Sequence, residues 1–539
     1  MVKLFLLASV LAVSPALAQA PGSCALGSAQ RFLSANDVQA SVFNTGGLFF
    51  GGSTTNGDGY IVPKSSGASP LYAATLWVGG TVGGEVRTSA ARYGRYQMWP
   101  GPLDAGATLP DAADCSAYDR IWVVSEADIA SYEQGSGATT DLREWPVGLG
   151  APAVDASGDP VAITGRGQTL DLAGGERPDL PGTQAAFWVM NDVGGTVDNT
   201  LPNGQTEARV PLGVEVAVLA YAIARSGDPL HRTTFYRYTL ANRSTATIDD
   251  LHLGFFVDPD LGSAPDDYVG VDEDRGLAFV YNQTPEDFVY GTPPALGFDL
   301  LGGLYSFTSP LKSGPEPYSA PDYPEGVYNR LRGRFNDGTP IREGGYGYPS
   351  EGGTGEEIRL MFPGDPVTGA YWSEVNIDGT GTNATSGDRR LTLSAPPVTL
   401  KSGDSTTIEL AILFAQGTGH LDSITKLREA SDAVQSSFNA RTGVAGEDDP
   451  QLDGLTLDPV FPNPISGTSE VVYTLASPGD VELTVFDALG RRVAELADAR
   501  QPEGTHTAQI DARALSPGVY VIRLRAGGET RSTRVTIVR

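Results

Sequence analysis

The chain has 539 residues, of which 65 are acidic and 37 are basic, so its formal net charge is −28. Nucleic acids and anionic membrane surfaces attract basic patches, so this charge argues against both as partners and favours solubility and cation binding. Hydrophobic residues make up 40% of the chain, together with 67 glycines and 38 prolines. This composition predicts a turn-rich globular protein of more than one domain rather than a disordered chain.

The N-terminal segment is typical of a secretory signal peptide. Lys3 precedes the apolar run LFLLASVLAV, and the small-residue sequence Ala-Leu-Ala follows at 16–18. We therefore expect residues 1–18 to be cleaved and the mature chain to begin near Gln19. The apolar run is too short to cross a bilayer and no later segment is long enough, so the sequence predicts no transmembrane segment in the mature chain.

The chain has two cysteines, Cys24 and Cys115. In an oxidising compartment an even number of cysteines allows a bridge, and we expect these two to form a disulfide. Closing a loop of about 90 residues would stabilise the fold by about 4–5 kcal/mol on the chain-entropy account. Two unpaired buried thiols are the alternative.

Residues 19–443 are predicted to form one large β-rich module. Segments rich in β-branched and aromatic residues are bounded by Gly, Asn, Asp and Pro, and they lie at 210–224, 233–244, 251–258 and 407–416. Apolar and polar residues alternate in 233–244 as expected for a strand buried on one face. Because no helical pattern alternates with these strands, an antiparallel β-sandwich is favoured over a doubly wound α/β fold.

Two stretches of the module depart from this strand pattern. Apolar residues at spacings of three, four or seven over 420–440 predict one amphipathic helix near the C-terminal end of the module. Residues 285–400 are rich in Gly, Pro and aromatic residues, and we expect them to form a long loop excursion that lines a surface or a groove.

A second domain follows the module. The acidic stretch at 444–455 contains Gly and Pro but no apolar periodicity, which indicates a linker. Beyond it, residues 456–539 contain six or seven short segments of alternating apolar and polar residues, separated by turn signals. This spacing predicts a small immunoglobulin-like β-sandwich, so the whole chain is expected to be all-β.

The tail resembles the type A C-terminal sorting domain of the type IX secretion system. The resemblance covers residues 457–539 and is carried by Pro462, Asn463, Pro464, Asp487, Gly490, Arg491, Gly504, Gly518, Val519 and Tyr520. It implies secretion by the Sec pathway and then export by the type IX translocon to the cell surface or the extracellular space. A generic terminal sandwich is the alternative, because other terminal β-domains share some of these features. The large module resembles exported Bacteroidota-type proteins that carry the same tail, which implies no particular reaction.

The most acidic stretch of the module is VDPDLGSAPDDYVGVDEDRG at 257–276. Strand-like segments flank it, so folding brings its like charges together, and Ca²⁺ prefers clustered carboxylate and carbonyl oxygens. The spacing does not match an EF-hand. We predict that these residues form a structural Ca²⁺ site: Asp258, Asp260, Asp266, Asp267, Asp272 and Asp274. The alternative is a solvated loop whose aspartates cap turns.

Other candidate chemistry is sparse in the sequence. Glu215 lies in an apolar segment, where it either faces solvent, pairs with an arginine such as Arg237, or serves as a general acid. Asn191 and Asp192 follow the apolar run AAFWVM and form a second polar cluster. The four histidines lack a metal-binding spacing, and the sequence contains no nucleophile elbow and no phosphate-binding loop.

The leading hypothesis is a non-enzymatic exported protein with a structural or interaction role, whose partner would be an extracellular glycan or a surface protein. The alternatives are a secreted polysaccharide-active hydrolase with paired carboxylates and a carbohydrate-binding protein. Tryptophans help to separate these hypotheses, because exposed ones stack on sugars and buried ones belong to the core. The six are Trp77, Trp99, Trp122, Trp145, Trp188 and Trp372.

Overall fold

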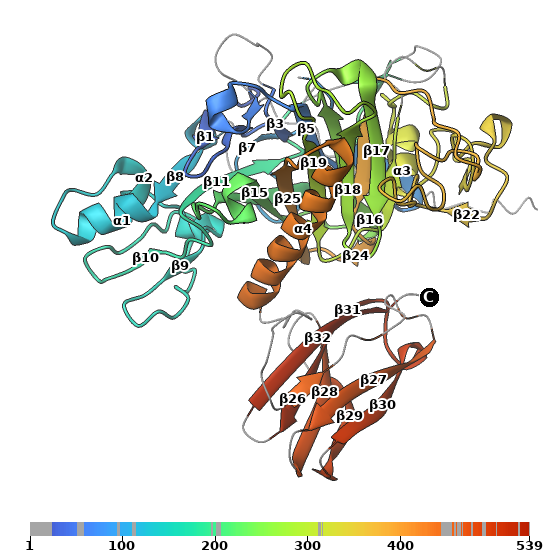
Figure 1. Cartoon of the computed structure of the whole chain (residues 1–539). Helices are drawn as coiled ribbons and strands as arrows, with labels where there is room; N and C mark the ends of the chain where they lie inside the picture. Colours follow the sequence, from blue (N-terminus) through green and yellow to red (C-terminus); the bar gives the residue numbers. More distant parts are fainter. Residues whose placement is uncertain are drawn as a thin grey trace, which may run out of the picture.

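The computed structural model describes residues 24–50, 59–93, 97–109, 115–195, 198–200, 206–310, 314, 316–442, 455–457, 460, 465, 467–475, 478–487, 492–502, 504–526 and 529–537. The predicted signal peptide lies outside these residues, as do the predicted linker up to residue 454 and the motif residues Pro462, Asn463, Pro464, Gly490 and Arg491. The described chain is dominated by antiparallel strands, as the sequence predicts, and Figure 1 shows a large β-rich module and a small β-domain.

Two antiparallel sheets build the large module. One sheet has ten strands within the described residues: β1 (Gln30–Leu33), β2 (Gln39–Phe43), β3 (Gly47–Leu48), β4 (Tyr60–Ile61), β5 (Leu71–Val82), β6 (Glu85–Ser89), β16 (Ile248–Pro259), β20 (Ser306–Thr308), β23 (Leu391–Ser394) and β24 (Val398–Leu400). The other has nine: β7 (Trp99–Pro100), β8 (Trp122–Ser125), β11 (Gln184–Asn191), β14 (Val214–Ala222), β15 (Thr233–Asn242), β17 (Asp267–Asp272), β18 (Leu277–Asn282), β19 (Ala295–Leu301) and β25 (Ser405–Ala415).

The main core lies between the two sheets and draws on both. Leu76 and Phe255 of the ten-stranded sheet belong to the same buried cluster as Tyr236 and Tyr238 of the nine-stranded sheet. β15 was expected to be half-buried, yet Phe235, which points to the opposite face, is only 1% exposed. A second apolar layer covers that face, so the nine-stranded sheet is buried on both sides.

Helix α4 (His420–Thr442) supplies much of this second layer and confirms the predicted amphipathic helix. Its apolar stripe, which includes Ile424, Leu427 and Val434, is buried against the nine-stranded sheet, and Figure 1 shows the helix lying along β19 and β25. Gly297 of β19 permits the close approach, because a Cβ there would lie 3.0 Å from Leu427 Cδ1 and 2.8 Å from Leu277 Cδ1.

Residues 285–400 are less loop-like than predicted. β19 lies inside the nine-stranded sheet between β18 and β25, and β20 and β23 extend the ten-stranded sheet. Every residue of the segment ALGFDLL at β19 is buried, which suits a strand covered on both sides rather than a loop. The rest of the stretch contains helix α3 (Pro324–Leu331) and the short pair β21 (Ile341–Arg342) and β22 (Glu357–Ile358).

Short elements decorate the N-terminal half of the module and were not predicted from periodicity. They are the helices α1 (Glu126–Glu133) and α2 (Thr140–Arg143), and the strand pairs β9 (Ala153–Val154) with β10 (Arg177–Pro178) and β12 (Asp198–Thr200) with β13 (Thr206–Ala208). Helix α1 begins with a capping box in which Ser125 and Asp128 satisfy each other's backbone N–H groups.

The tail folds as two small antiparallel sheets around its own core. One contains β26 (Leu455–Leu457), β27 (Thr468–Leu475) and β30 (Gly504–Asp511). The other contains β28 (Gly479–Asp487), β29 (Arg492–Gln501), β31 (Gly518–Ala526) and β32 (Glu529–Ile537). Val485, Ile522 and Val535 are fully buried within this core.

A disulfide joins Cys24 to Cys115, as the sequence predicts. The amide of Cys24 also donates to the carbonyl of Gly194, so the start of the described chain is tied to the nine-stranded sheet region by a covalent bond and a hydrogen bond.

The disulfide predicts a measurable loss of stability on its removal. Cys24→Ser should lower the free energy of unfolding by about 4–5 kcal/mol, because the unfolded chain regains the freedom of a loop that spans a sequence separation of 91 residues. Urea unfolding of the variant, with chemically reduced wild type as the matched control, measures this. Equal stability of variant and oxidised wild type would contradict the prediction.

Candidate functional site

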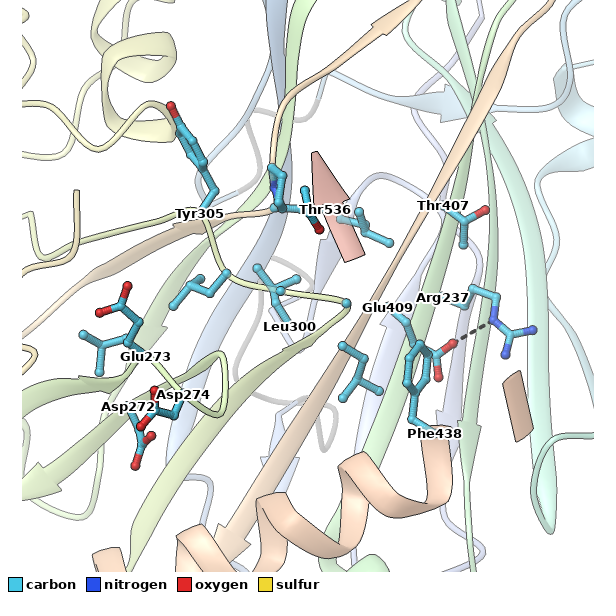
Figure 2. Close-up of a pocket in the computed structure, with 18 of the residues that line it drawn as sticks. Arg237, Asp272, Glu273, Asp274, Leu300, Tyr305, Thr407, Glu409, Phe438 and Thr536 are labelled. Carbon is cyan, nitrogen blue, oxygen red and sulfur yellow. Dashed lines mark hydrogen bonds and ion pairs between the residues drawn. The ribbon is translucent and has the colours of Figure 1, made fainter. Parts of the chain in front are cut away.

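A carboxylate on the doubly buried sheet is held in an ion-pair cluster. Glu409 of β25 lies opposite Arg237 of β15 in the strand register, and the Arg237 Nε lies 2.8 Å from its Oε2. Arg441, near the end of α4, and the Tyr221 hydroxyl contact its other oxygen. Burial, and then the charge of Glu409, raises the pKa of Tyr221. Figure 2 shows the Arg237–Glu409 pair, and both carboxylate oxygens of Glu409 are engaged.

Glu215 is paired as well, although with a different arginine from the one considered above. Arg243 Nη2 lies 2.7 Å from its Oε1, and the amide of Leu103 donates to Oε2 at 2.5 Å. Arg243 follows β15 directly, so the prediction of an arginine partner holds while Arg237 serves Glu409 instead. Glu215 therefore has partners on both oxygens.

Asp192 is fully buried and also has a structural environment. Its carboxylate accepts hydrogen bonds from the amides of Leu212, Gly213 and Val214, and it pairs with buried Arg209 at 3.0 Å. The neighbouring Asn191 donates to the carbonyl of Gly101. These bonds fix the loop that leads into β14.

The six aspartates of the predicted Ca²⁺ site fall into three groups, of which the first two are near enough for the charge of Asp260 to act on Asp267. Asp258 and Asp260 lie near Asp388, and one carboxylate oxygen from each of the three falls within 4.8 Å of the others. Arg390 pairs with Asp258 at 2.8 Å and also contacts Asp388, while the Tyr93 hydroxyl donates to Asp258 at 2.6 Å. A guanidinium therefore already neutralises much of this first group.

Asp266 and Asp267 form a second group at the start of β17. Asp267 is fully buried, and burial raises its pKa well above the usual range, helped by the charges of Asp266 and Asp260. Asn282 and Asp287, which the sequence reading did not select, lie beside them. Asn282 ends the strand that pairs with β17, so the hairpin pattern of the sequence contained a signal for this neighbour.

Asp272 and Asp274 lie at the far end of β17, in a third place. Asp272 is paired with Arg275 at 3.2 Å and with Arg428 of α4 at 2.9 Å, which joins the helix to the hairpin. Asp274 is exposed and, with Glu273, borders a broad groove (Figure 2). The register of β17 and β18 separates these residues from Asp266 by the length of the strand.

The walls that the large module gives this groove carry acidic side chains and one exposed aromatic ring. Tyr371 is 51% exposed and donates its hydroxyl to Glu343, which is also at the groove. All six tryptophans are elsewhere in the core, with exposed fractions between 0 and 7%. The groove therefore offers carboxylates without a tryptophan platform for a sugar.

Asp299 of β19 is a buried acid with an unusual titration. The Ser431 hydroxyl and the Gln435 side-chain amide of α4 donate to its oxygens at 2.6 and 2.7 Å. Burial nevertheless dominates and raises the pKa of Asp299 to about 7, with the charges of Asp272 and Asp432 acting in the same direction. This acid connects the helix to the sheet.

Comparison with known proteins identifies the tail. Residues 459–539 match the family model of the secretion system C-terminal sorting domain. In this region Gly518 begins β31, and the Tyr520 hydroxyl donates to the carbonyl of Ser516 at 2.7 Å. No curated protein matches the chain.

Two solved structures show only weak similarity. A polysaccharide lyase is 11% identical with a TM-score of 0.20, and the match covers 64% of this chain and 39% of the lyase. Dimeric latent PorU from Porphyromonas gingivalis is 9% identical with a TM-score of 0.16, and the match covers 66% of this chain and 32% of PorU. The matches span less than half of either solved chain, and likeness at this level carries no argument.

The fold and the family match together define a large β-rich module followed by a C-terminal sorting domain. The C-terminal region is a type IX secretion sorting domain, and the protein is exported through that system to the cell surface or the extracellular space. Its tail interacts with the secretion machinery. Among the described residues, no helix is both long enough and apolar enough to span a membrane.

The titration of Asp299 predicts a specific pH dependence of stability. Its pKa of about 7 in the folded protein lies above the usual aspartate value of 3.8, so the folded state holds the proton more tightly between these two pH values. The contribution of Asp299 to stability is therefore fully present below about pH 4, is lost progressively between about pH 4 and pH 7, and has fallen by up to about 4 kcal/mol above pH 7. Asp299→Asn mimics the protonated acid and should remove this fall.

Urea unfolding at pH 5 and pH 8 measures the effect as the difference between wild type and variant. Asp274→Asn, which removes an exposed carboxylate, is the matched control and should keep the wild-type difference. An identical pH response of Asp299→Asn and wild type would show that Asp299 does not titrate in this range.

Proposed function

We propose that the protein is a non-enzymatic, exported β-rich protein with a structural or interaction role outside the cell. The observation that supports this role most directly is the use of the buried carboxylates. Glu215, Glu409, Asp192 and Asp258 each pair with an arginine, so their charges are neutralised within the fold. A catalytic pair of carboxylates needs one acid and one base that face a substrate.

The buried tryptophans support the same proposal. Sugar-active proteins present aromatic faces to their ligands, whereas each tryptophan here is packed in the interior. Trp77, for example, stacks on Phe256 with ring centroids 5.3 Å apart, and its indole N–H donates to the carbonyl of Ala91. These side chains stabilise the module and are closed to a glycan.

A polysaccharide-active protein is the second candidate, and the acidic groove is the observation that favours it. Glu273, Asp274 and Glu343 border this groove, and Tyr371 provides an exposed ring. A glycan array and a reducing-sugar assay with the purified mature protein separate the two candidates. Binding that Tyr371→Ala abolishes would favour the carbohydrate-binding reading, and turnover that Glu273→Gln abolishes would favour the hydrolase.

The sorting domain predicts the behaviour of a truncated chain. In a host with a type IX system, deletion of residues 456–539 should retain the protein in the periplasm, because the secretion machinery recognises that domain. Cell fractionation measures the distribution, and a full-length chain with Asp274→Asn is the control that should reach the outside. Efficient export of the truncated chain would refute the role of the tail.

A further inference from the structure

One part of the groove carries more positive than negative charge. Arg237 and Arg441 both pair with Glu409, and all three residues line the groove. Tyr221, which contacts the same carboxylate, stays protonated, because burial and then the charge of Glu409 raise its pKa. Two guanidinium groups and one carboxylate give this group, which we call the arginine corner, a net charge of +1, although the whole chain has a formal charge of −28.

The surplus of positive charge distinguishes this corner from other ion pairs of the module. Buried Asp192, for example, pairs with Arg209 alone. Asp272 contacts two arginines, yet each of those arginines also contacts a second acid. Glu409 differs from both, because neither of its two arginines contacts another acid in the described part of the chain. The corner therefore holds a cation for which the protein supplies no counter-charge.

The guanidinium of Arg237 has unused hydrogen-bond donors. Its Nε lies 2.8 Å from Glu409 Oε2. The two terminal nitrogens, which carry four of the five N–H bonds of an arginine, have no hydrogen-bond partner among the described residues. Figure 2 shows them on the far side of the guanidinium from Glu409. Because the side chain is 29% exposed and lines the groove, these donors are accessible to a ligand.

Arg441 is held in place beside Arg237 with part of its hydrogen-bonding capacity unused. Its terminal nitrogens donate to Glu409 and to the Tyr221 hydroxyl. Its guanidinium carbon lies 5.1 Å from the ring centroid of Tyr221 and 5.6 Å from that of Phe438. The Nε atom is buried and has no hydrogen-bond partner in the described chain. A negative charge beside this fixed cation would lower the electrostatic cost of burying it.

Two threonine hydroxyls lie next to Arg237 on the same face of the sheet. Thr239 and Thr407 are directly opposite each other in the β15–β25 register, two residues along from the Arg237–Glu409 pair. Side chains two residues apart on a strand share a face, so the hydroxyls and the guanidinium are neighbours. The two Oγ1 atoms lie 3.0 Å apart, so one hydroxyl donates to the other and the second keeps its hydrogen for a different acceptor. Thr407 is exposed and lines the groove.

This arrangement favours an oxyanion as the ligand. Carboxylate and sulfate groups accept two parallel N–H bonds from the terminal nitrogens of an arginine, and a neighbouring hydroxyl can donate a third bond. The net positive charge of the corner repels cations and attracts anions. The groove also has an acidic wall, where Glu273 and Asp274 are exposed. That wall repels a polyanion, so a ligand with one isolated anionic group fits the groove better than a highly charged polymer.

We propose that Arg237 and Thr407, with the charge of Arg441 beside them, bind an oxyanion in the groove. The bound group is a carboxylate or a sulfate, either as a free ion or as the acidic group of a larger ligand such as a uronic acid sugar. All three residues belong to the large module, so the tail contributes no part of the site. The inference goes beyond the proposed structural or interaction role, because it assigns a ligand chemistry to the groove and requires no reaction there.

Isothermal titration calorimetry of the mature full-length protein at low ionic strength tests the site with two matched sugars. Galacturonate carries a carboxylate where galactose carries a hydroxymethyl group, so only galacturonate offers an oxyanion. We expect galacturonate to bind about tenfold more tightly than galactose, and sodium sulfate to compete with it. Binding of sulfate without binding of galacturonate would support the site and assign it to a free ion. Absence of binding of both anions would overturn the proposal.

Three variants separate anion binding from a purely structural ion pair. Arg237→Gln should weaken anion binding about tenfold and still fold, because Arg441 continues to neutralise Glu409; its melting temperature checks this. Glu409→Gln removes the competing carboxylate and should tighten anion binding, an effect that a structural role does not produce. Arg177→Gln, the matched control, removes an exposed arginine of β10 outside the groove and should leave the affinity unchanged. Unchanged affinity in folded Arg237→Gln would overturn the proposal.

Discussion

Burial of the nine-stranded sheet on both faces is the constraint on which the large module depends. β25 lies between β15 and β19, and its alternate side chains, such as Leu410 and Leu413, enter the core between the sheets and the layer beneath α4. Any charge on these strands must then find a partner inside the protein. Glu409 meets Arg237 and Arg441 for this reason, and Asp299 meets the polar side chains of the helix.

This constraint also shapes the functional argument. Glu215, which the sequence left open as a general acid, pairs with Arg243 just beyond β15, and Glu409 pairs with Arg237 of the neighbouring strand and with Arg441 of α4. Export of the protein depends on the C-terminal sorting domain, whose core consists of its own residues, such as Val485 and Ile522. The signal for export and the large module are thus different parts of the chain.

The sequence revealed what local patterning controls. The strands at 233–244 and 407–416, helix α4, the disulfide and the sorting domain all follow from periodicity, cysteine count or motifs. The pairing of strands that lie far apart in the sequence could not be predicted from local patterns. Nothing in the aromatic and Gly-rich stretch 285–400 shows that Ala295–Leu301 inserts beside β25, because the partner strand is more than 100 residues away. The acidic loop was recognised, yet Arg390 and Asp287, which divide it into distinct environments, enter through tertiary contacts.

The β-sheets of the two domains share no backbone hydrogen bonds among the described strands. Among the described strands, those of the tail pair only with one another, and those of the module pair only within it. A protease that cuts between Thr442 and Leu455 would therefore sever one peptide bond and leave every sheet hydrogen bond of the module in place. The groove would change, however, because Pro517, Gly518, Thr536 and Ile537 of the tail line it together with the module, so a cleaved form would present a more open surface there.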